Sequence, residues 1–183
     1  MCSYLDKPSD QDDDLNFESS SSQSLLERCH SQLHHLPSPF SRHFTEVQSS
    51  FLFGETLRVF QWNILAQSLG KENDNFVNCC PSTFDWKTRR WRVLEEIIRH
   101  DPDIICLQEV DHPKLMFKAL QSVGYSGRFL HKPDSPCVYL PNNNGPDGCA
   151  VFFKTSKFEV LGWATRILKV WDVASNQVGR YTE

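Results

Sequence analysis

The chain has 183 residues, of which 39% are hydrophobic and 23% are charged, which is enough for one ordinary domain with some appended sequence. The formal net charge of −4 excludes the general basic surface that nucleic-acid-binding domains usually carry. A local basic patch beside an acidic site would still be compatible with an RNA substrate. No apolar run reaches the ~18 residues that a membrane-spanning helix needs.

Seven cysteines form an odd set without C-x-x-C pairs, which favours a reducing compartment over a disulfide framework. The acidic N-terminal stretch MCSYLDKPSDQDDDL is typical neither of a secretory signal nor of an Arg-rich transit peptide. We therefore expect a soluble cytoplasmic protein, with mitochondrial or nuclear forms as alternatives.

The N-terminal third of the chain precedes the main domain. Residues 1–24 are rich in Asp and Ser and poor in apolar side chains, which predicts a disordered tail. In residues 25–36, the i, i+4 spacing of Leu25, Cys29 and Leu33 predicts a short amphipathic helix, which ends before Pro37. The remainder of residues 25–56 is expected to be a connector.

The domain is predicted to start near Leu57, with a strand from Arg58 to Asn63. Ser82 is followed by an acidic residue three positions later, which predicts that Ser82 caps the helix WKTRRWRVLEEIIRH. The Asp101-Pro102 step should end this helix, because the residue before a proline disfavours helical backbone.

A continuous apolar run from Ile104 to Leu107 predicts a strand buried on both faces, with Cys106 as a small buried hydrophobe. The later pattern alternates helix and strand, so the fold class is α/β. The expected elements are a helix over 113–123 that ends at Gly124, a strand over 127–131, a loop over 133–148, and a hairpin that pairs Cys149–Phe153 with Phe158–Leu161.

Two polar residues stand where predicted strands leave the sheet. Glu109 follows the buried run directly, and Asn63 ends the first strand. Ligands gather at the carboxyl ends of strands in open α/β sheets, and a carboxylate and an amide oxygen suit Mg²⁺, which keeps several waters. A structural role stays open for both residues: Glu109 as an ion-pair partner of a nearby Arg, and Asn63 as a turn residue.

The sequence also resembles a known family. The deadenylase-like branch of the endonuclease/exonuclease/phosphatase superfamily carries similar motifs in the same order. The matching segments are Gln61–Ala66, Asp74–Val77, Cys106–Asp111, His131–Pro133, Ser135–Cys137 and Asn143–Ala150.

The resemblance implies that Glu109 is the Mg²⁺ ligand and a catalytic residue, that Asn63 is the active-site amide, and that Lys132 binds substrate near its phosphate. The substrate so implied is NADP(H), from which the 2′-phosphate is removed, with poly(A) RNA as the alternative. The implied fold is a two-sheet α/β sandwich, of which residues 57–178 would form the N-terminal half and residues 179–183 a divergent end. Since the superfamily's later catalytic motifs are absent after Val178, we expect a truncated form with little or no activity. A non-catalytic regulatory or interaction protein is the competing hypothesis, and a plain structural α/β domain is a weaker third.

Three further features are not expected to carry catalysis. Asp111-His112-Pro113 resembles the superfamily's late Asp-His element, but its position predicts a helix start with Pro113 in the first turn. The spacing of His30 and His34 could suggest a metal, but it is better explained by an exposed helix face. Asp147 lies in a turn-rich loop and is assigned no catalytic task.

Overall fold

The computed structural model describes residues 15–18, 21–45, 56–72, 81–141, 143–166, 171–172 and 177–178. None of the helices in these ranges is long and apolar enough to cross a membrane. The helices are α1 (Ser22–Leu33), α2 (Gln67–Glu72), α3 (Trp86–His100) and α4 (Pro113–Ser122), with short 3₁₀ turns at Pro81–Phe84 and Pro136–Tyr139. The strands are β1 (Val59–Asn63), β2 (Ile104–Val110), β3 (Tyr125–His131), β4 (Gly148–Lys154), β5 (Trp171–Asp172) and β6 (Gln177–Val178).

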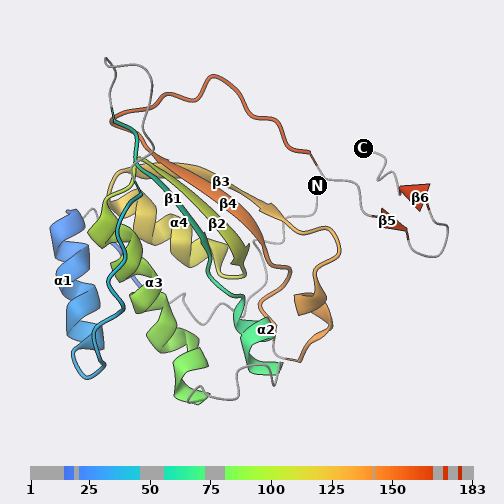
Figure 1. Cartoon of the computed structure of the whole chain (residues 1–183), viewed down its shortest axis with the longest axis horizontal. Coiled ribbons are helices and arrows are strands. Elements are labelled where there is room, and N and C mark those ends of the chain that lie inside the picture. Colours follow the sequence, from blue (N-terminus) through green and yellow to red (C-terminus); the bar gives the residue numbers. More distant parts are fainter. Residues whose placement is uncertain are drawn as a thin grey trace.

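The main sheet has four strands in the order β1-β2-β4-β3 (Figure 1). β1 runs parallel to β2, whereas β4 is antiparallel to both β2 and β3. β5 and β6 form a separate antiparallel pair. The mixed α/β class expected from the sequence is confirmed. The register places Asn63 beside Gln108, so the carboxyl ends of β1 and β2 lie at the same edge of the sheet.

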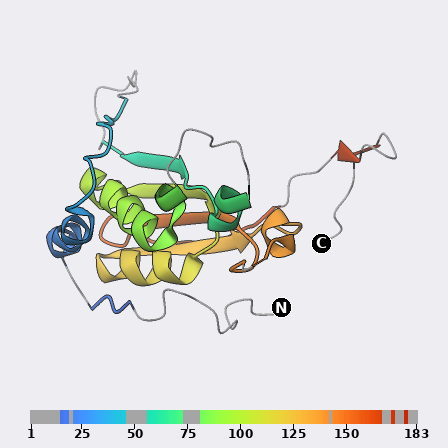
Figure 2. The ribbon, with the colours of Figure 1, turned by 90° about the horizontal axis from the view of Figure 1, so that it is seen from below.

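One face of the sheet carries the core. α3 and α4 lie on the same face, and α1 packs on α3 (Figure 1, Figure 2). Ile105 and Leu107 of β2 and Phe152 of β4 point into this core and are fully buried. Leu25, Cys29 and Leu33 are buried as well, which confirms the predicted face of the first helix.

The expectation that β2 is buried on both faces was wrong. Ile104 and Cys106 alternate with the buried residues and are only half-buried, because no described helix covers the opposite face of the sheet. Val59 and Val151 also open onto that face and are 49% and 38% exposed. Cys106 is therefore not a fully buried hydrophobe, although partial burial raises the pKa of its thiol.

The ends of α3 show how local chemistry sets the helices. Its N-cap is Asp85, whose carboxylate accepts from the Lys87 amide, so the prediction of a Ser82 cap was wrong. Ser82 lies instead in the 3₁₀ turn before the helix. The helix ends as predicted at Asp101, which adopts a left-handed conformation with φ of 45° before Pro102.

Two other boundaries differ from expectation. Most of the predicted tail 1–24 lies outside the described residues, but Leu15 and Phe17 are described and pack against the core, and α1 starts at Ser22. The hairpin between Cys149–Phe153 and Phe158–Leu161 was wrong: β4 pairs with β2 and β3, and residues 158–166 form no strand. The turn that follows β4 does exist, at residues 155–157.

Candidate metal site at the carboxyl edge of the sheet

Asn63 and Glu109 meet at the edge where β1 and β2 end. The Asn63 side-chain amide donates from Nδ2 to Glu109 Oε1 at 2.7 Å. The backbone amide of Ala66 donates to Glu109 Oε2 at 3.3 Å. The contact between the two strand ends was expected, but the amide faces the carboxylate with its nitrogen. Its oxygen accepts instead from the Leu65 amide at 3.0 Å.

A bulge aims the Glu109 side chain. The pairing of β2 with β4 shifts register between Leu107 and Val110, and Glu109 has a φ of 55°. Non-glycine residues rarely adopt positive φ, and bulges often redirect a side chain at a sheet edge. The result is a half-buried carboxylate at the rim, held by one side-chain donor and one backbone donor.

Two charged side chains lie behind this carboxylate. Arg89 of α3 donates from Nη2 to the carbonyl oxygens of Ile64 and Leu65 at 2.5 and 2.6 Å. Burial lowers the pKa of Arg89, while the charges of Asp111 and Glu109 raise it. Asp111 is 2% exposed and accepts from the Gln67 amide at 2.7 Å. Burial raises the pKa of Asp111, against the opposing effects of His112, backbone amides and Arg89.

His112 lies deeper still. Its ring stacks on Trp86 with centroids 4.1 Å apart and an interplanar angle of 13°. Its Nε2 lies 2.9 Å from Gln67 Oε1 and 2.7 Å from Asn144 Nδ2. The residue is 1% exposed and stands at the N-cap of α4, followed by Pro113, which confirms the predicted helix start. His112 thus ties the loop that carries Asn144 to the segment after β1.

Lys132 follows β3 at the same edge of the sheet. His131 pairs with Gly148, which pairs in turn with Val110. Two strand spacings, or about 10 Å, therefore separate the ends of β3 and β2. The Lys132 side chain is exposed, and its backbone amide donates to the Asp147 carbonyl at 2.7 Å. An exposed ammonium at this distance can reach toward a phosphate bound beside Glu109.

Asp147 anchors the loop that precedes β4. It is 4% exposed, and its Oδ1 accepts from the Ser135 hydroxyl and, at 3.6 Å, from the Cys137 thiol. The Ser135 hydroxyl also accepts from the Asp147 and Cys137 amides at 3.1 and 3.2 Å. These contacts give Asp147 a structural role in holding the loop before β4.

The donor set at the edge fits a hard cation. Each Glu109 oxygen receives one hydrogen bond and keeps a further lone pair, and Mg²⁺ needs only one or two carboxylates because it retains several waters. Within the described part of the chain there is no group of three or more His, Cys, Asp or Glu side chains that could hold a metal ion. A single carboxylate such as that of Glu109 would suit Mg²⁺ better than Zn²⁺, which usually takes three or four protein ligands.

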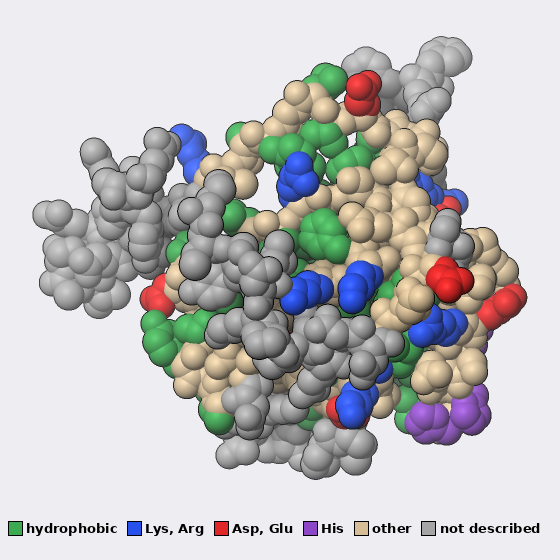
Figure 3. Space-filling model, turned by 180° about the vertical axis from the view of Figure 1, so that it is seen from behind, with side chains coloured by type: hydrophobic (Ala, Val, Ile, Leu, Met, Phe, Trp, Pro, Cys, Tyr) green, Lys and Arg blue, Asp and Glu red, His purple; other side chains and the backbone are tan. Residues whose placement is uncertain are grey.

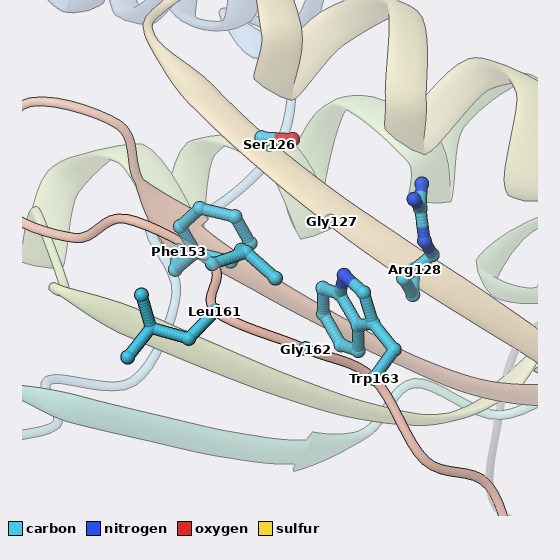
Figure 4. A pocket seen from close by; sticks show the side chains of 8 residues that line it. Ser126, Gly127, Arg128, Phe153, Leu161, Gly162 and Trp163 are labelled. Carbon is cyan, nitrogen blue, oxygen red and sulfur yellow. The ribbon is translucent and has the colours of Figure 1, made fainter.

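A separate cavity of about 350 Å³ lies on the face of the sheet away from α3 and α4. Leu161, Gly162 and Trp163 cross above the strands there, and Trp163 lies between Arg128 and Phe153 (Figure 4). In Figure 3, exposed hydrophobic side chains lie beside Lys and Arg side chains. The cavity lining contains no carboxylate, so this cavity does not offer the oxygen ligands that Glu109 offers.

Comparison with known proteins decides the family. Residues 60–172, which include Asn63, Glu109 and Lys132, match the endonuclease/exonuclease/phosphatase family. The chain belongs to this family. Members of the endonuclease/exonuclease/phosphatase family are hydrolases, and they generally use a divalent metal ion.

Three relatives show the breadth of the likeness. The chain is 50% identical to nocturnin of Drosophila melanogaster over 134 residues, which is 73% of this chain and 21% of that protein. It is 31% identical over 131 residues to the Ccr4 3′-5′-exoribonuclease subunit of the CCR4-Not complex of Emericella nidulans, covering 69% and 19% of the two chains. The crystal structure of ANGEL2, a 2′,3′-cyclic phosphatase, matches with a TM-score of 0.50 and 34% identity over 58% of this chain and 29% of that one.

The chain spans between 21% and 40% of the length of the nocturnins that it matches, from fly to frog. It is nocturnin-like in sequence, and its relatives include both an exoribonuclease and a phosphatase. These relatives act on different nucleotide substrates, so membership of the family fixes the class of chemistry and leaves the substrate open.

Two residues beside Glu109 were not predicted from the sequence to be part of the site. Arg89 lies inside a helix among other basic residues, and its contacts with Ile64 and Leu65 span 25 and 24 positions. Asp111 was interpreted as the end of the family-like segment Cys106–Asp111 and as part of a helix start, and no site role was assigned to it. Its position two residues after Glu109 was the one available hint, since a carboxylate so near the sheet edge must find donors if it is buried.

Proposed function

We propose that this chain carries the metal-binding part of a Mg²⁺-dependent phosphoester hydrolase that removes the 2′-phosphate from NADP(H). The observation that carries the proposal is the Asn63–Glu109 pair at the carboxyl edge of the sheet. The similarity to ANGEL2, a 2′,3′-cyclic phosphatase, supports a phosphatase reaction, and the family resemblance of the sequence suggests NADP(H) as the substrate.

In this proposal Glu109 is the metal ligand and Asn63 orients it. When bound, Mg²⁺ polarises a phosphoryl oxygen and lowers the cost of attack at phosphorus. The Asn63 amide holds one carboxylate oxygen and the Ala66 amide holds the other, and each oxygen keeps a further lone pair for a cation. Lys132 supplies a positive charge from the end of β3, two strands away along the same edge, which favours a phosphate dianion between Lys132 and the metal.

Poly(A) RNA is the second candidate substrate. The observation in its favour is the similarity to the exoribonuclease subunit of Emericella nidulans. The net charge of −4 counts against long-range attraction of a polyanion, although Lys132 offers a local contact. Competition between the two substrates on one preparation separates the candidates.

The experiment measures free phosphate from NADP(H) and tail length of poly(A), with Mg²⁺ or with EDTA, on the 183-residue protein. Glu109→Gln removes the charge with little change in shape, and Glu159→Gln is the matched control because Glu159 is exposed on residues 158–166. Any phosphate release, which would contradict the expectation of an inactive form, should depend on Mg²⁺, be lost in Glu109→Gln and be kept in Glu159→Gln. Tail shortening with the same dependence would favour the deadenylase.

A binding measurement separates the competing non-catalytic hypothesis. Mn²⁺ replaces Mg²⁺ at oxygen sites and is followed by electron paramagnetic resonance. A protein that binds Mn²⁺ through Glu109 but releases no phosphate from either substrate would support a regulatory or interaction role. Mn²⁺ affinity that is the same in Glu109→Gln as in the unaltered protein would contradict the proposed metal site.

A further inference from the structure

The segment between β1 and α2 shapes the metal-binding carboxylate. Its Ala66 amide contacts Glu109 Oε2, and its Leu65 amide contacts the Asn63 oxygen. Leu65 has a φ of 61°, a left-handed conformation that residues with side chains keep only where their surroundings hold it. The segment therefore needs an external restraint to place the Ala66 amide correctly.

Arg89 supplies that restraint from α3. A single guanidinium nitrogen, Nη2, donates to the carbonyl oxygens of Ile64 and Leu65, which flank the strained backbone of Leu65. The other terminal nitrogen, Nη1, is buried and has no hydrogen-bond partner among the described residues. Both bonds thus depend on one atom, and removing it would release two consecutive carbonyl groups together.

Asp111 holds the next residue of the same segment. Its Oδ2 accepts from the amide of Gln67, the first residue of α2, at 2.7 Å. The Ile64 and Leu65 carbonyls are thus held by the Arg89 cation, and the Gln67 amide by the Asp111 anion. The guanidinium also feels the charges of both Asp111 and Glu109. Arg89 is consequently linked to Glu109 in two ways: through the backbone of residues 64–66 and through its charge.

We propose that Arg89 is a positioning residue for divalent-metal binding, acting through the Ile64–Ala66 segment on the carboxylate of Glu109. The proposal rests on the proposed function, because it takes Glu109 to be the metal ligand. It does not require Arg89 to touch the metal or the substrate. Partners that orient a metal ligand typically change metal affinity about 10–100-fold when they are altered.

The test compares Mn²⁺ affinity of the 183-residue protein with that of Arg89→Met and Arg89→Lys. Methionine keeps the length of the side chain and removes the charge and both hydrogen bonds. Lysine keeps the charge and offers one donor atom, as Arg89 does through Nη2. We expect Mn²⁺ binding to weaken about tenfold in Arg89→Met and less in Arg89→Lys.

The matched control is Arg92→Met on the same helix. Within the described part of the chain, Arg92 donates to Glu95 and to the Pro37 carbonyl and makes no hydrogen bond to residues 64–66. Both Met variants thus lose one guanidinium charge and at least one backbone carbonyl contact from α3. A general loss of stability would make Arg89→Met and Arg92→Met weaken Mn²⁺ binding equally, provided that both lower the melting temperature by the same amount.

A double-mutant cycle with Glu109→Gln makes the linkage specific. If Arg89 acts through Glu109, then Arg89→Met has no further effect on Mn²⁺ affinity once Glu109 is Gln. The amide proton shift of Ala66, measured by NMR without metal, should move in Arg89→Met and stay in Arg92→Met. Additive losses in the cycle, or an unmoved Ala66 amide, would overturn the proposal.

The two proposals fail in different ways. If Glu109→Gln weakens Mn²⁺ binding while Arg89→Met leaves it unchanged, only the positioning role of Arg89 is wrong. If Glu109→Gln has no effect, the metal site itself is wrong, and the role of Arg89 is overturned with it. Should Arg89→Met fail to fold, Arg89→Lys in the same cycle decides the question.

Discussion

Asp103 allows a quantitative test of the electrostatics away from the candidate site. Its carboxylate is 1% exposed, and its Oδ1 lies 2.8 Å from Lys157 Nζ, while Oδ2 accepts from the Arg58 amide at 3.0 Å. Lys154 adds a further contact at 3.5 Å. The hydrogen bond from Lys157 and the one from Arg58 lower the pKa of Asp103 from its usual 3.8 to about 2.

The direction of this pKa change fixes the pH dependence of stability. Because the folded pKa lies below the unfolded value, the stabilisation is fully present above about pH 4 and is lost as the pH falls toward 2. The difference between the two pKa values corresponds to about 2 kcal/mol. Lys157 is 47% exposed, so solvent screens its charge, and a contribution on the order of 1 kcal/mol is expected.

The assay is urea unfolding of the unaltered protein and Asp103→Asn between pH 7 and pH 3. Asparagine keeps an acceptor for the Arg58 amide, so the difference in the free energy of unfolding between the two proteins measures the effect of the Asp103 charge. We expect a gap in the free energy of unfolding at pH 7 that narrows to about half as the pH falls from 4 to 3, and that narrows also in high salt. A gap of equal size at pH 7 and pH 3 would refute the electrostatic explanation.

Three further predictions concern the core, the thiols and the substrate. Phe152→Ala should destabilise the protein by about 3–5 kcal/mol because Phe152 is fully buried, whereas Phe153→Ala on the opposite face should cost clearly less, as measured by urea unfolding. Burial raises the pKa of the Cys137 thiol to about 11, so iodoacetamide at pH 8 should label exposed Cys149 well before Cys137 in peptide mapping. Lys132→Ala should weaken NADP(H) binding, measured as a higher Kd, without changing the melting temperature, and an unchanged Kd would remove Lys132 from the substrate site.

Much of the fold follows from local sequence patterns. The i, i+4 spacing of Leu25, Cys29 and Leu33 gives the buried face of α1, and the Asp101-Pro102 step gives the end of α3. The hairpin after β4 was mispredicted because strand pairing depends on distant partners: β4 finds β2 and β3, which occupy both of its edges. A short apolar run such as 158–161 carries no information about whether an edge is free.

The candidate site was likewise predicted only in part. Asn63 and Glu109 were predictable because each interrupts an apolar strand with a polar residue, and parallel strands bring such interruptions to one edge. Which atom of Asn63 faces Glu109 was not predictable, because the Leu65 amide captures the side-chain oxygen. Lys132 was assigned through family resemblance, and the sheet register now places it at the same edge without that resemblance.

The strained backbone explains why sequence patterns stop short of this site. Rules for positive φ point to Gly, Asn or Asp, yet here the left-handed residues are Leu65 and Glu109, which those rules would pass over. Neither conformation is favoured locally, so each is held by contacts distant in sequence: the Leu65 carbonyl accepts from Arg89, and the Glu109 carboxylate accepts from Asn63 and Ala66. Strain of this kind persists where the surroundings over-determine it, and it gathers at functional positions. Leu65 and Glu109 also lie at the two ends of the contacts that link Arg89 to the Glu109 carboxylate. The metal-binding experiments therefore test the same part of the structure that the sequence did not predict.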